Sequence, residues 1–207
     1  MNEMPDVSII VTNYNYGKYL PRCLRSCLNQ RNVNVEVILI DDCSTDNSIE
    51  MIKPYENKIR LFRTEKNLGI GGASNLGLEK ATAQFVIRVD ADDYVNQDMS
   101  HIMKTYLEAN HDAFCVSCDY HLVDNHENVL ERKYASDDPV SCGIMYRKDL
   151  LVSQGGYDQQ IRHREEEELR KRLGDYYKIH HLRIPFYRYR MHNHNKTKSS
   201  EYKNFKV

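Results

Sequence analysis

The sequence predicts an α/β fold in which a mostly parallel central sheet is flanked by helices. In the first 90 residues, short runs rich in β-branched residues alternate with stretches of helical character, and this alternation is typical of parallel βαβ units. After Asp93 the alternation stops, and a hairpin signal predicts a small antiparallel element in the C-terminal half. The 207 residues are 41% hydrophobic. This is enough for one core, so we expect a single domain over residues 1–207.

Four runs of aliphatic and β-branched residues predict the strands of the parallel sheet. Each run is preceded or followed by turn-forming residues, as is typical of short strands. The four predicted buried strands are residues 7–12, 35–41, 59–64 and 85–90.

Helical stretches fill the segments between these strands. Pro21 suits the first turn of a helix over residues 19–30, and a cap rich in Asn, Asp and Ser begins a helix over residues 46–55. A third helix is predicted over residues 72–81. The C-terminal half predicts a helix near residues 99–109, a strand over residues 113–120 and a hairpin through Asn125.

Composition and charge exclude several classes of protein. The formal net charge of −1 and the pI near 6.7 carry no bias toward nucleic acid, so we predict no nucleic-acid partner. No stretch approaches the roughly 20 apolar residues of a membrane helix, so we expect no transmembrane segment and a cytoplasmic protein. Six cysteines scattered through a chain of this length predict reduced thiols. Cys115 and Cys118 form a C-x-x-C, but in a strand-like run positions three apart face opposite sides, which argues against a redox or zinc role.

Polar residues follow the predicted strands at the points where the strands end. Ligands of open parallel sheets bind beyond the carboxyl ends of the strands, so residues at these ends are candidates for a site. The first strand delivers Thr12, Asn13 and Tyr14, the second delivers Asp41 and Asp42, and the fourth delivers Asp90, Asp92 and Asp93. Five carboxylates at one edge repel one another unless a cation neutralises them.

A divalent cation is the simplest remedy for that repulsion. Mn²⁺ and Mg²⁺ bind carboxylate oxygens and complete their shells with water and substrate phosphates, so we expect a substrate that carries a diphosphate. The alternative is that these aspartates belong to ordinary solvated turns, where aspartate is common. Their shared placement after two buried strands favours a site.

Motifs along nearly the whole chain resemble, in order, those of the glycosyltransferase family 2 enzymes of the GT-A fold. The N-terminal half carries VSIIVTNYN, LIDDCSTDNS, NLGIGGASNLGLEKAT and RVDADD, of which the last is similar to the family's DXD metal motif. The C-terminal half carries GIMYRKDLLVSQGGYD, HREEEELRKRL and YRYRMHNHNKT. The resemblance implies a Rossmann-like GT-A fold and the inverting transfer of a sugar from a nucleoside-diphosphate sugar.

The resemblance also implies roles for particular residues and ranges. Residues 1–94 would be the nucleotide-binding half, residues 95–192 the acceptor-binding half, and residues 193–207 a polar tail. The implied nucleotide-binding residues are Thr12, Tyr14 and Asp42 at the nucleoside, Asp41 supporting the turn, and Asn75, Asp90, Arg190 and His192. The implied metal ligands are Asp92, Asp90 and Asp93.

One departure from the family's pattern concerns the phosphates. Ser74 stands where the family often has an arginine, so the usual positive partner of a phosphate is missing unless Lys66, Arg190 or His192 replaces it. Arg190 and His192 alternate onto one face of a strand-like run and could close over the diphosphate, because arginine donors match phosphate oxygens.

The second departure concerns the catalytic base. Glu165 and Glu166 stand where the family has a Glu-Asp pair with aspartate as the base. These glutamates could instead form the acidic first turn of a helix, paired with basic residues four positions later. Because Leu169 and Leu173 define the buried stripe of that helix, a carboxylate beside them is desolvated and becomes a stronger base. Motif register favours Glu166 over Glu165 as the base.

The predicted function is the transfer of a sugar, from UDP by preference, to a hydroxyl of a glycan or lipid-linked acceptor in bacterial surface polysaccharide synthesis. We interpret the tail lysines as solvated, with weak contact to the inner face of the cell membrane as the alternative. A homodimer could complete the acceptor side. Two other functions stay open, namely a sugar nucleotidyltransferase and a catalytically silent nucleotide-sugar-binding protein.

Overall fold

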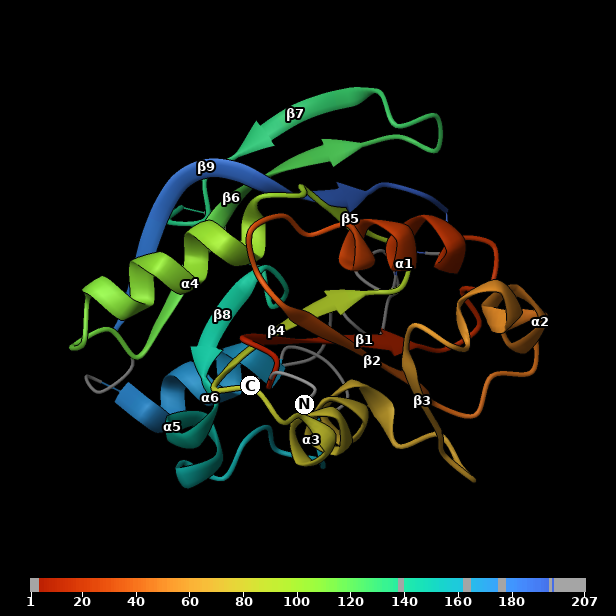
Figure 1. Ribbon diagram of the computed structural model, residues 1–207, viewed down its shortest axis with the longest axis horizontal. Coiled ribbons are helices and arrows are strands. Elements are labelled where there is room, and N and C mark those ends of the chain that lie inside the picture. Colours follow the sequence, from red (N-terminus) through yellow and green to blue (C-terminus); the bar gives the residue numbers. More distant parts are fainter. Residues whose placement is uncertain (1–3, 138–139, 162–164, 175–177, 194, 196–207) are drawn as a thin grey trace.

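The computed structural model describes residues 4–137, 140–161, 165–174, 178–193 and 195. Its centre is one nine-stranded sheet with helices on both faces (Figure 1). This arrangement confirms the predicted α/β fold.

The parallel half of the sheet consists of β1 (Val7–Asn13), β2 (Val35–Asp41), β3 (Arg60–Arg63) and β4 (Phe85–Asp90). β1 pairs in parallel with both β2 and β4, and β2 pairs in parallel with β3. The carboxyl ends of these strands therefore lie at one edge of the sheet, as predicted. The prediction that all four strands are buried is wrong for β3. Three of its four residues are exposed, because β3 is the outer strand of the sheet.

The rest of the sheet mixes strand directions. It contains β5 (Tyr94–Val95), β6 (Cys115–Val123), β7 (Val129–Lys133), β8 (Ile144–Arg147) and β9 (Ile179–Arg190). β8 runs antiparallel to β4 and β6, and β6 forms an antiparallel hairpin with β7, so the expected antiparallel element and the hairpin through Asn125 are confirmed. β9 runs parallel to β6, which places the carboxyl end of β9 at the same edge as that of β4.

Six α-helices connect the described strands. They are α1 (Leu20–Leu28), α2 (Ser48–Ile52), α3 (Gly69–Lys80), α4 (Met99–Ala109), α5 (Lys148–Ser153) and α6 (Glu165–Leu173). The helix predicted over residues 46–55 is α2 followed by the 3₁₀ turn η1 (Lys53–Tyr55), since Pro54 has no N–H to continue an α-helix. None of the described helices has the length and apolar composition that crossing a membrane requires.

Two hydrophobic cores lie on opposite faces of the sheet, and β1 contributes to both. Ile9 packs in the core with α1 and α4, whereas Ile10 packs in the core with α3, α5 and α6 (Figure 1). Successive strand residues face opposite sides, so one buried strand serves both layers. Gly77 lets α3 approach β1 closely, because a Cβ at this position would lie 2.3 Å from Ile10 Cγ2.

Candidate active site

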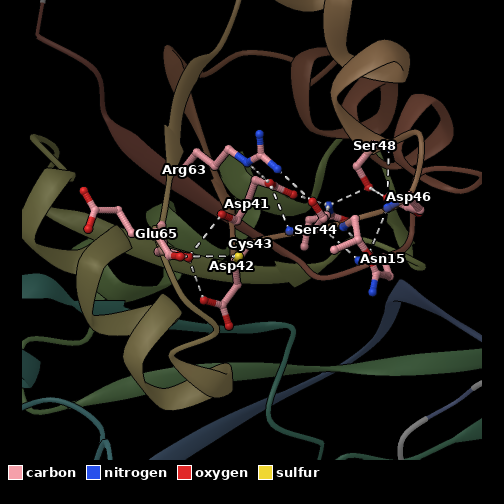
Figure 2. A network of polar contacts seen from close by, with 12 residues as sticks. Asn15, Asp41, Asp42, Cys43, Ser44, Asp46, Ser48, Arg63 and Glu65 are labelled. Atoms are coloured by element: carbon pink, nitrogen blue, oxygen red, sulfur yellow. Dashed lines mark hydrogen bonds and ion pairs between the residues drawn. The ribbon is translucent and has the colours of Figure 1, made fainter.

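The Asp41 carboxylate is fully buried where β2 ends, and its oxygens are engaged within the protein (Figure 2). Oδ1 accepts a hydrogen bond from Asn13 Nδ2 at 2.8 Å, and Oδ2 accepts one from the Ser44 backbone N–H at 3.3 Å. Arg63 Nε lies 3.2 Å from Oδ2 and forms an ion pair with it. These donors compensate the charge of Asp41 and attach the turn after β2 to the end of β1.

The turns after β1 and β2 bind each other through further polar contacts (Figure 2). Asn15 and Cys43 adopt left-handed backbone conformations, with φ of 61° and 62°, and the Asn15 carbonyl Oδ1 accepts the Thr45 N–H at 2.8 Å. Burial opposes ionisation of Asp46, but hydrogen bonds donated by Ser48 and by a backbone N–H outweigh it and lower the pKa of Asp46. The two strand ends are therefore held in a fixed relative position.

The Asp42 carboxylate points away from that of Asp41, toward the start of α3 (Figure 2). Oδ1 accepts the Leu68 N–H at 2.8 Å and the Thr64 hydroxyl at 3.0 Å, and Oδ2 accepts the Gly69 N–H at 2.9 Å. A negative charge at a helix N-terminus satisfies orphan N–H groups and interacts favourably with the helix dipole. These contacts explain why α3 begins three residues before the predicted start at residue 72.

Asp90, Asp92 and Asp93 form a second acidic group at the end of β4, which we call the acidic rim. The Asp90 side chain is 30% exposed and accepts a hydrogen bond from Thr12 Oγ1 at 3.3 Å. Both oxygens of the buried Asp93 accept hydrogen bonds, one from the Tyr187 hydroxyl and one from the Arg190 N–H, each at 2.8 Å. Burial and the charges of Asp92 and Asp90 raise the pKa of Asp93 well above its usual range. The raised pKa shows that the carboxylates of the rim repel one another.

The donor set of the rim fits a hard divalent cation through its oxygens. Asp90, Asp93 and Cys142 each bring a potential ligand atom within 4.8 Å of the others. Burial and the charges of Asp90 and Asp93 raise the pKa of Cys142, so its thiol keeps its proton and contributes little to a hard cation. Asp92 was predicted as a metal ligand, and the structure pairs its carboxylate with His192 Nε2 at 2.9 Å. Carboxylate oxygens suit Mn²⁺ or Mg²⁺.

Aromatic residues cover the rim from the side of the turn after β1. The ring of Tyr19 stacks on His192 with a centroid distance of 4.8 Å, and Tyr16 meets the same imidazole edge-on at 5.7 Å. Burial and the neighbouring charges of Asp92 and Asp90 raise the pKa of the Tyr16 phenol. Neither Tyr16 nor Tyr19 was predicted as a site residue. Their position directly after the strand that also delivers the partly buried Tyr14 was the available signal.

Arg190 lies at the rim, and its guanidinium is bound to the protein. Nε donates to the Asp92 carbonyl at 2.9 Å and Nη1 to the Asp124 carbonyl at 3.3 Å. Nη2 lies 3.5 Å from the Glu127 carboxylate. Arg190 thus connects the turn between β6 and β7 to the acidic rim, a role that was not predicted from the sequence.

Arg88 is a buried cation that was not predicted as a site residue, because it lies inside a predicted strand. Its Nη1 lies 2.7 Å from Glu165 Oε1 and 3.3 Å from the Ser74 hydroxyl, and its Nε lies 3.3 Å from Asp90 Oδ1. Burial opposes the charged form, but Asp90 and Glu165 outweigh it and raise the pKa of Arg88. A guanidinium therefore lies beside Ser74, where the family's arginine is missing, and it comes from β4 rather than from Lys66, Arg190 or His192.

Glu166 is fully buried and accepts a hydrogen bond from the Tyr146 hydroxyl at 2.6 Å. The two candidate bases thus have different partners, since Glu165 pairs with the cation of Arg88. The side chain of Asn75 forms two hydrogen bonds with the backbone of Tyr157, at 2.7 and 2.9 Å. Its amide is engaged in holding the chain between α5 and α6, whereas a nucleotide contact was expected.

The fold and the acidic rim together define the class of protein. Solved GT-A structures share this mixed sheet. Staphylococcus aureus TarS 1–349 in complex with UDP-GlcNAc has a TM-score of 0.79 at 22% identity, covering 98% of this chain and 62% of that one. The mannosyltransferase PcManGT of Pyrobaculum calidifontis, in complex with GDP-Man and Mn²⁺, has a TM-score of 0.73 at 18% identity, covering 94% and 59%. These similarities establish the GT-A fold.

The sequence model of "Glycosyl transferase family 2" matches residues 8–191, and the chain belongs to this family. It is 41% identical over 111 residues to an uncharacterized glycosyltransferase of Haemophilus influenzae, covering 52% of this chain and 44% of that protein. It is 33% identical over 113 residues to the poly(ribitol-phosphate) beta-N-acetylglucosaminyltransferase TarS, covering 52% and 20%. The chain thus spans less than half the length of these two relatives.

Proposed function

We propose that this chain carries the catalytic domain of an inverting glycosyltransferase. It would move a sugar from a nucleoside-diphosphate sugar, preferably UDP-linked, to a hydroxyl of a glycan or lipid-linked acceptor in bacterial surface polysaccharide synthesis. The observation that carries the proposal is the acidic rim, with Asp90 partly exposed beside the end of β1 and Asp92 covered by His192. TarS and PcManGT, which share the fold, were solved with UDP-GlcNAc and with GDP-Man and Mn²⁺, respectively.

Donor binding is assigned to the ends of β1, β2 and β4. Thr12, Tyr14 and Asp42 would hold the nucleoside, while Asp90 and Asp92 would hold Mn²⁺ or Mg²⁺. When bound, such an ion acts as a Lewis acid toward the departing diphosphate. Asp93 orients the rim, because both of its oxygens already accept hydrogen bonds from Tyr187 and Arg190.

Glu166 is the proposed base. The acceptor oxygen would form a bond to the anomeric carbon as the bond to the diphosphate oxygen breaks, and Glu166 would take the acceptor's proton. A single displacement of this kind inverts the anomeric centre. Glu165 is instead engaged in an ion pair with Arg88 at 2.7 Å, so its carboxylate is less available to the acceptor. The hydrogen bond from the neutral Tyr146 hydroxyl orients Glu166.

Calorimetry with UDP in the presence and absence of Mn²⁺ tests the donor site, and we expect Mn²⁺ to increase the affinity for UDP. An assay of sugar release or transfer from UDP-sugars then tests for turnover. Binding of UDP without turnover on any acceptor mixture would identify a silent binding protein. Formation of pyrophosphate from UTP and a sugar phosphate would identify a nucleotidyltransferase.

The pair Glu166→Gln and Glu165→Gln tests the base. We expect Glu166→Gln to lower turnover by about 100-fold or more while the affinity for UDP is unchanged, which is the range of general-base contributions. Glu165→Gln should retain more activity than Glu166→Gln. Unchanged turnover in Glu166→Gln, together with a loss in Glu165→Gln, would assign the base to Glu165.

A further inference from the structure

A pocket of about 500 Å³ lies beside the candidate active site, between α1, β5, β9 and the turn from β6 to β7. This volume is within the range of small-molecule sites. Its lining includes Arg22, Arg25, Tyr94, Glu127 and Arg188, and we call it the arginine pocket. Tyr94 directly follows Asp93 of the acidic rim, so the arginine pocket adjoins the place where sugar transfer is proposed.

Positive charge exceeds negative charge in the arginine pocket. Glu127 is the acidic residue of the lining, and Arg22 Nε already binds both of its oxygens at 2.8 and 3.1 Å. Within the part of the chain that the structure describes, no carboxylate lies within ion-pair distance of Arg25 or Arg188. Their hydrogen bonds go to neutral oxygens, namely the Tyr55 hydroxyl for Arg25 and backbone carbonyls for Arg188.

The surroundings of Arg188 also favour a negative ligand. Burial and the nearby charge of Arg22 lower the pKa of Arg188, although Tyr94 and Cys118 act in the opposite direction. An anion placed between these two guanidinium groups would relieve their repulsion. Arg22 also lies over the Tyr94 ring, 3.8 Å from its centroid, so its position is fixed by packing as well as by Glu127.

The chemistry of the lining selects an oxyanion. Guanidinium groups present planar pairs of donors that match the oxygens of phosphate or carboxylate. Asn29 and Gln97 line the same pocket, and their amides can bind the hydroxyls of a sugar or polyol that carries the anion. Such a lining suits an anionic glycan better than a neutral one.

We propose that the arginine pocket binds a phosphate or carboxylate group of the acceptor, so that the acceptor is an anionic glycan. The identification of the ligand as an acceptor rests on the proposed function, whereas anion binding by the pocket does not. The anion would be held next to Tyr94, and a neighbouring hydroxyl of the same chain could then reach the rim.

Anion binding is tested by calorimetry in EDTA without nucleotide, so that the donor site does not contribute. The probes are glycerol 3-phosphate and glucuronate, with glycerol and glucose as neutral controls, all at one ionic strength. We expect at least one anionic probe to bind and neither neutral probe to do so. Binding of the phosphate alone would indicate a phosphate-bearing acceptor, and binding of glucuronate alone would indicate a uronic acid.

Variants then locate the binding. Arg25→Gln and Arg188→Gln should each weaken the binding by about tenfold or more, because each variant removes a charge-assisted hydrogen bond to the anion. Arg188→Lys should retain part of the affinity. The matched control is Arg183→Gln, at an exposed position on the same strand. Absence of anion binding, or equal weakening by Arg183→Gln, would overturn the proposal, even if the enzyme transfers sugar. Anion binding without any sugar transfer would count against the proposed function alone.

Discussion

The acidic residues that end β2 and those that end β4 look alike in the sequence but differ in their surroundings. Asp41 and Asp42 accept hydrogen bonds from Asn13, two backbone N–H groups at the start of α3 and other donors. At the acidic rim, the Asp90 side chain is 30% exposed, and the three close carboxylates act on one another so that the pKa of Asp93 is raised by burial and by its neighbours.

This difference shows that an aspartate pair after a buried strand does not by itself indicate a metal site. The repulsion expected among five carboxylates is largely removed by protein donors in the β2 group, which supports the turn and caps a helix. At the rim, repulsion remains even though Asp90 lies beside Arg88 and Asp92 beside His192. Burial and the neighbouring charges still raise the pKa of Asp93, and a bound cation would relieve this repulsion. The hydrogen-bond donors and charges around each carboxylate therefore distinguish the aspartates that end β2 from those of the acidic rim.

The largest expected effect is on catalysis, through Asp92→Asn. We expect turnover to fall by about 100-fold or more, equivalent to roughly 3 kcal/mol of transition-state stabilisation, if this carboxylate holds the ion that assists the leaving diphosphate. The free energy of unfolding should change by less than about 1 kcal/mol. Steady-state kinetics with a UDP-sugar and urea denaturation measure the two quantities. Normal turnover in Asp92→Asn would show that the acidic rim is no more important for catalysis than the aspartates that end β2.

Asp41→Asn should mainly lower the stability of the fold, unlike Asp92→Asn. We expect the free energy of unfolding to fall by about 2–3 kcal/mol, because the substitution disturbs a buried, charge-assisted network with Asn13 and Arg63. Urea denaturation measures this change. The exposed Glu56→Gln serves as the control and should be neutral. Equal stability of the two variants would show that Asp41 has no structural role.

The affinity for Mn²⁺ tests the difference between the acidic groups of β2 and β4 in a single experiment. Asp90→Asn should weaken Mn²⁺ binding by about tenfold or more, since it removes a proposed ligand. Asp42→Asn should leave Mn²⁺ affinity within about twofold, because the Asp42 oxygens are engaged at the start of α3. Titration of free Mn²⁺ by electron paramagnetic resonance gives both values, and a similar loss in both variants would contradict the division.

The smallest expected effect lies at the other end of β2. Burial raises the pKa of Glu36, but hydrogen bonds from Ser8 and Thr82 outweigh it and lower the pKa below its usual value. A lowered pKa means that Glu36 stabilises the fold above its unfolded pKa of about 4.3, and that this contribution is lost as the pH falls through the folded value.

Glu36→Gln should therefore cost about 1 kcal/mol of unfolding free energy at pH 7, with the difference from the native protein shrinking below about pH 4. Urea denaturation at several pH values follows this change. A difference that grows on acidification would contradict the hydrogen-bond explanation. Turnover at pH 7 should be unaffected, since Glu36 lies far from the carboxyl end of β2.

Most of the framework could be predicted from the sequence, since it follows from local patterns. The strands β2 (Val35–Asp41) and β4 (Phe85–Asp90) and the helix α4 (Met99–Ala109) have the predicted bounds. The start of α3 could not be predicted, because the acceptor of its first N–H groups is Asp42, which is 27 residues away from Gly69. The exposure of β3 was also missed, because an edge strand differs from a central strand only in its neighbours.

The residues of the candidate site likewise include some that could be predicted from the sequence and some that could not. Residues that follow a strand directly, such as Asp90 and Asp92, were selected by their position, whereas Tyr16 and Arg88 were not. Arg88 lies in β4, whose sequence pattern predicts a buried strand. Its role becomes visible only when Glu165, which is 77 residues later, lies against it.

The sequence by itself determined which elements form, which carboxylates end the strands and which family the motifs resemble, because periodicity and motif order are properties of neighbouring residues. Only the tertiary structure decided which partners surround each carboxylate. β9 joins the sheet beside β6 and brings His192 to Asp92, 100 residues apart in the chain, and α3 brings its N-terminal N–H groups to Asp42. Hydrogen bonding and desolvation depend on distance in space, so they set the chemistry of each aspartate only after the chain has folded.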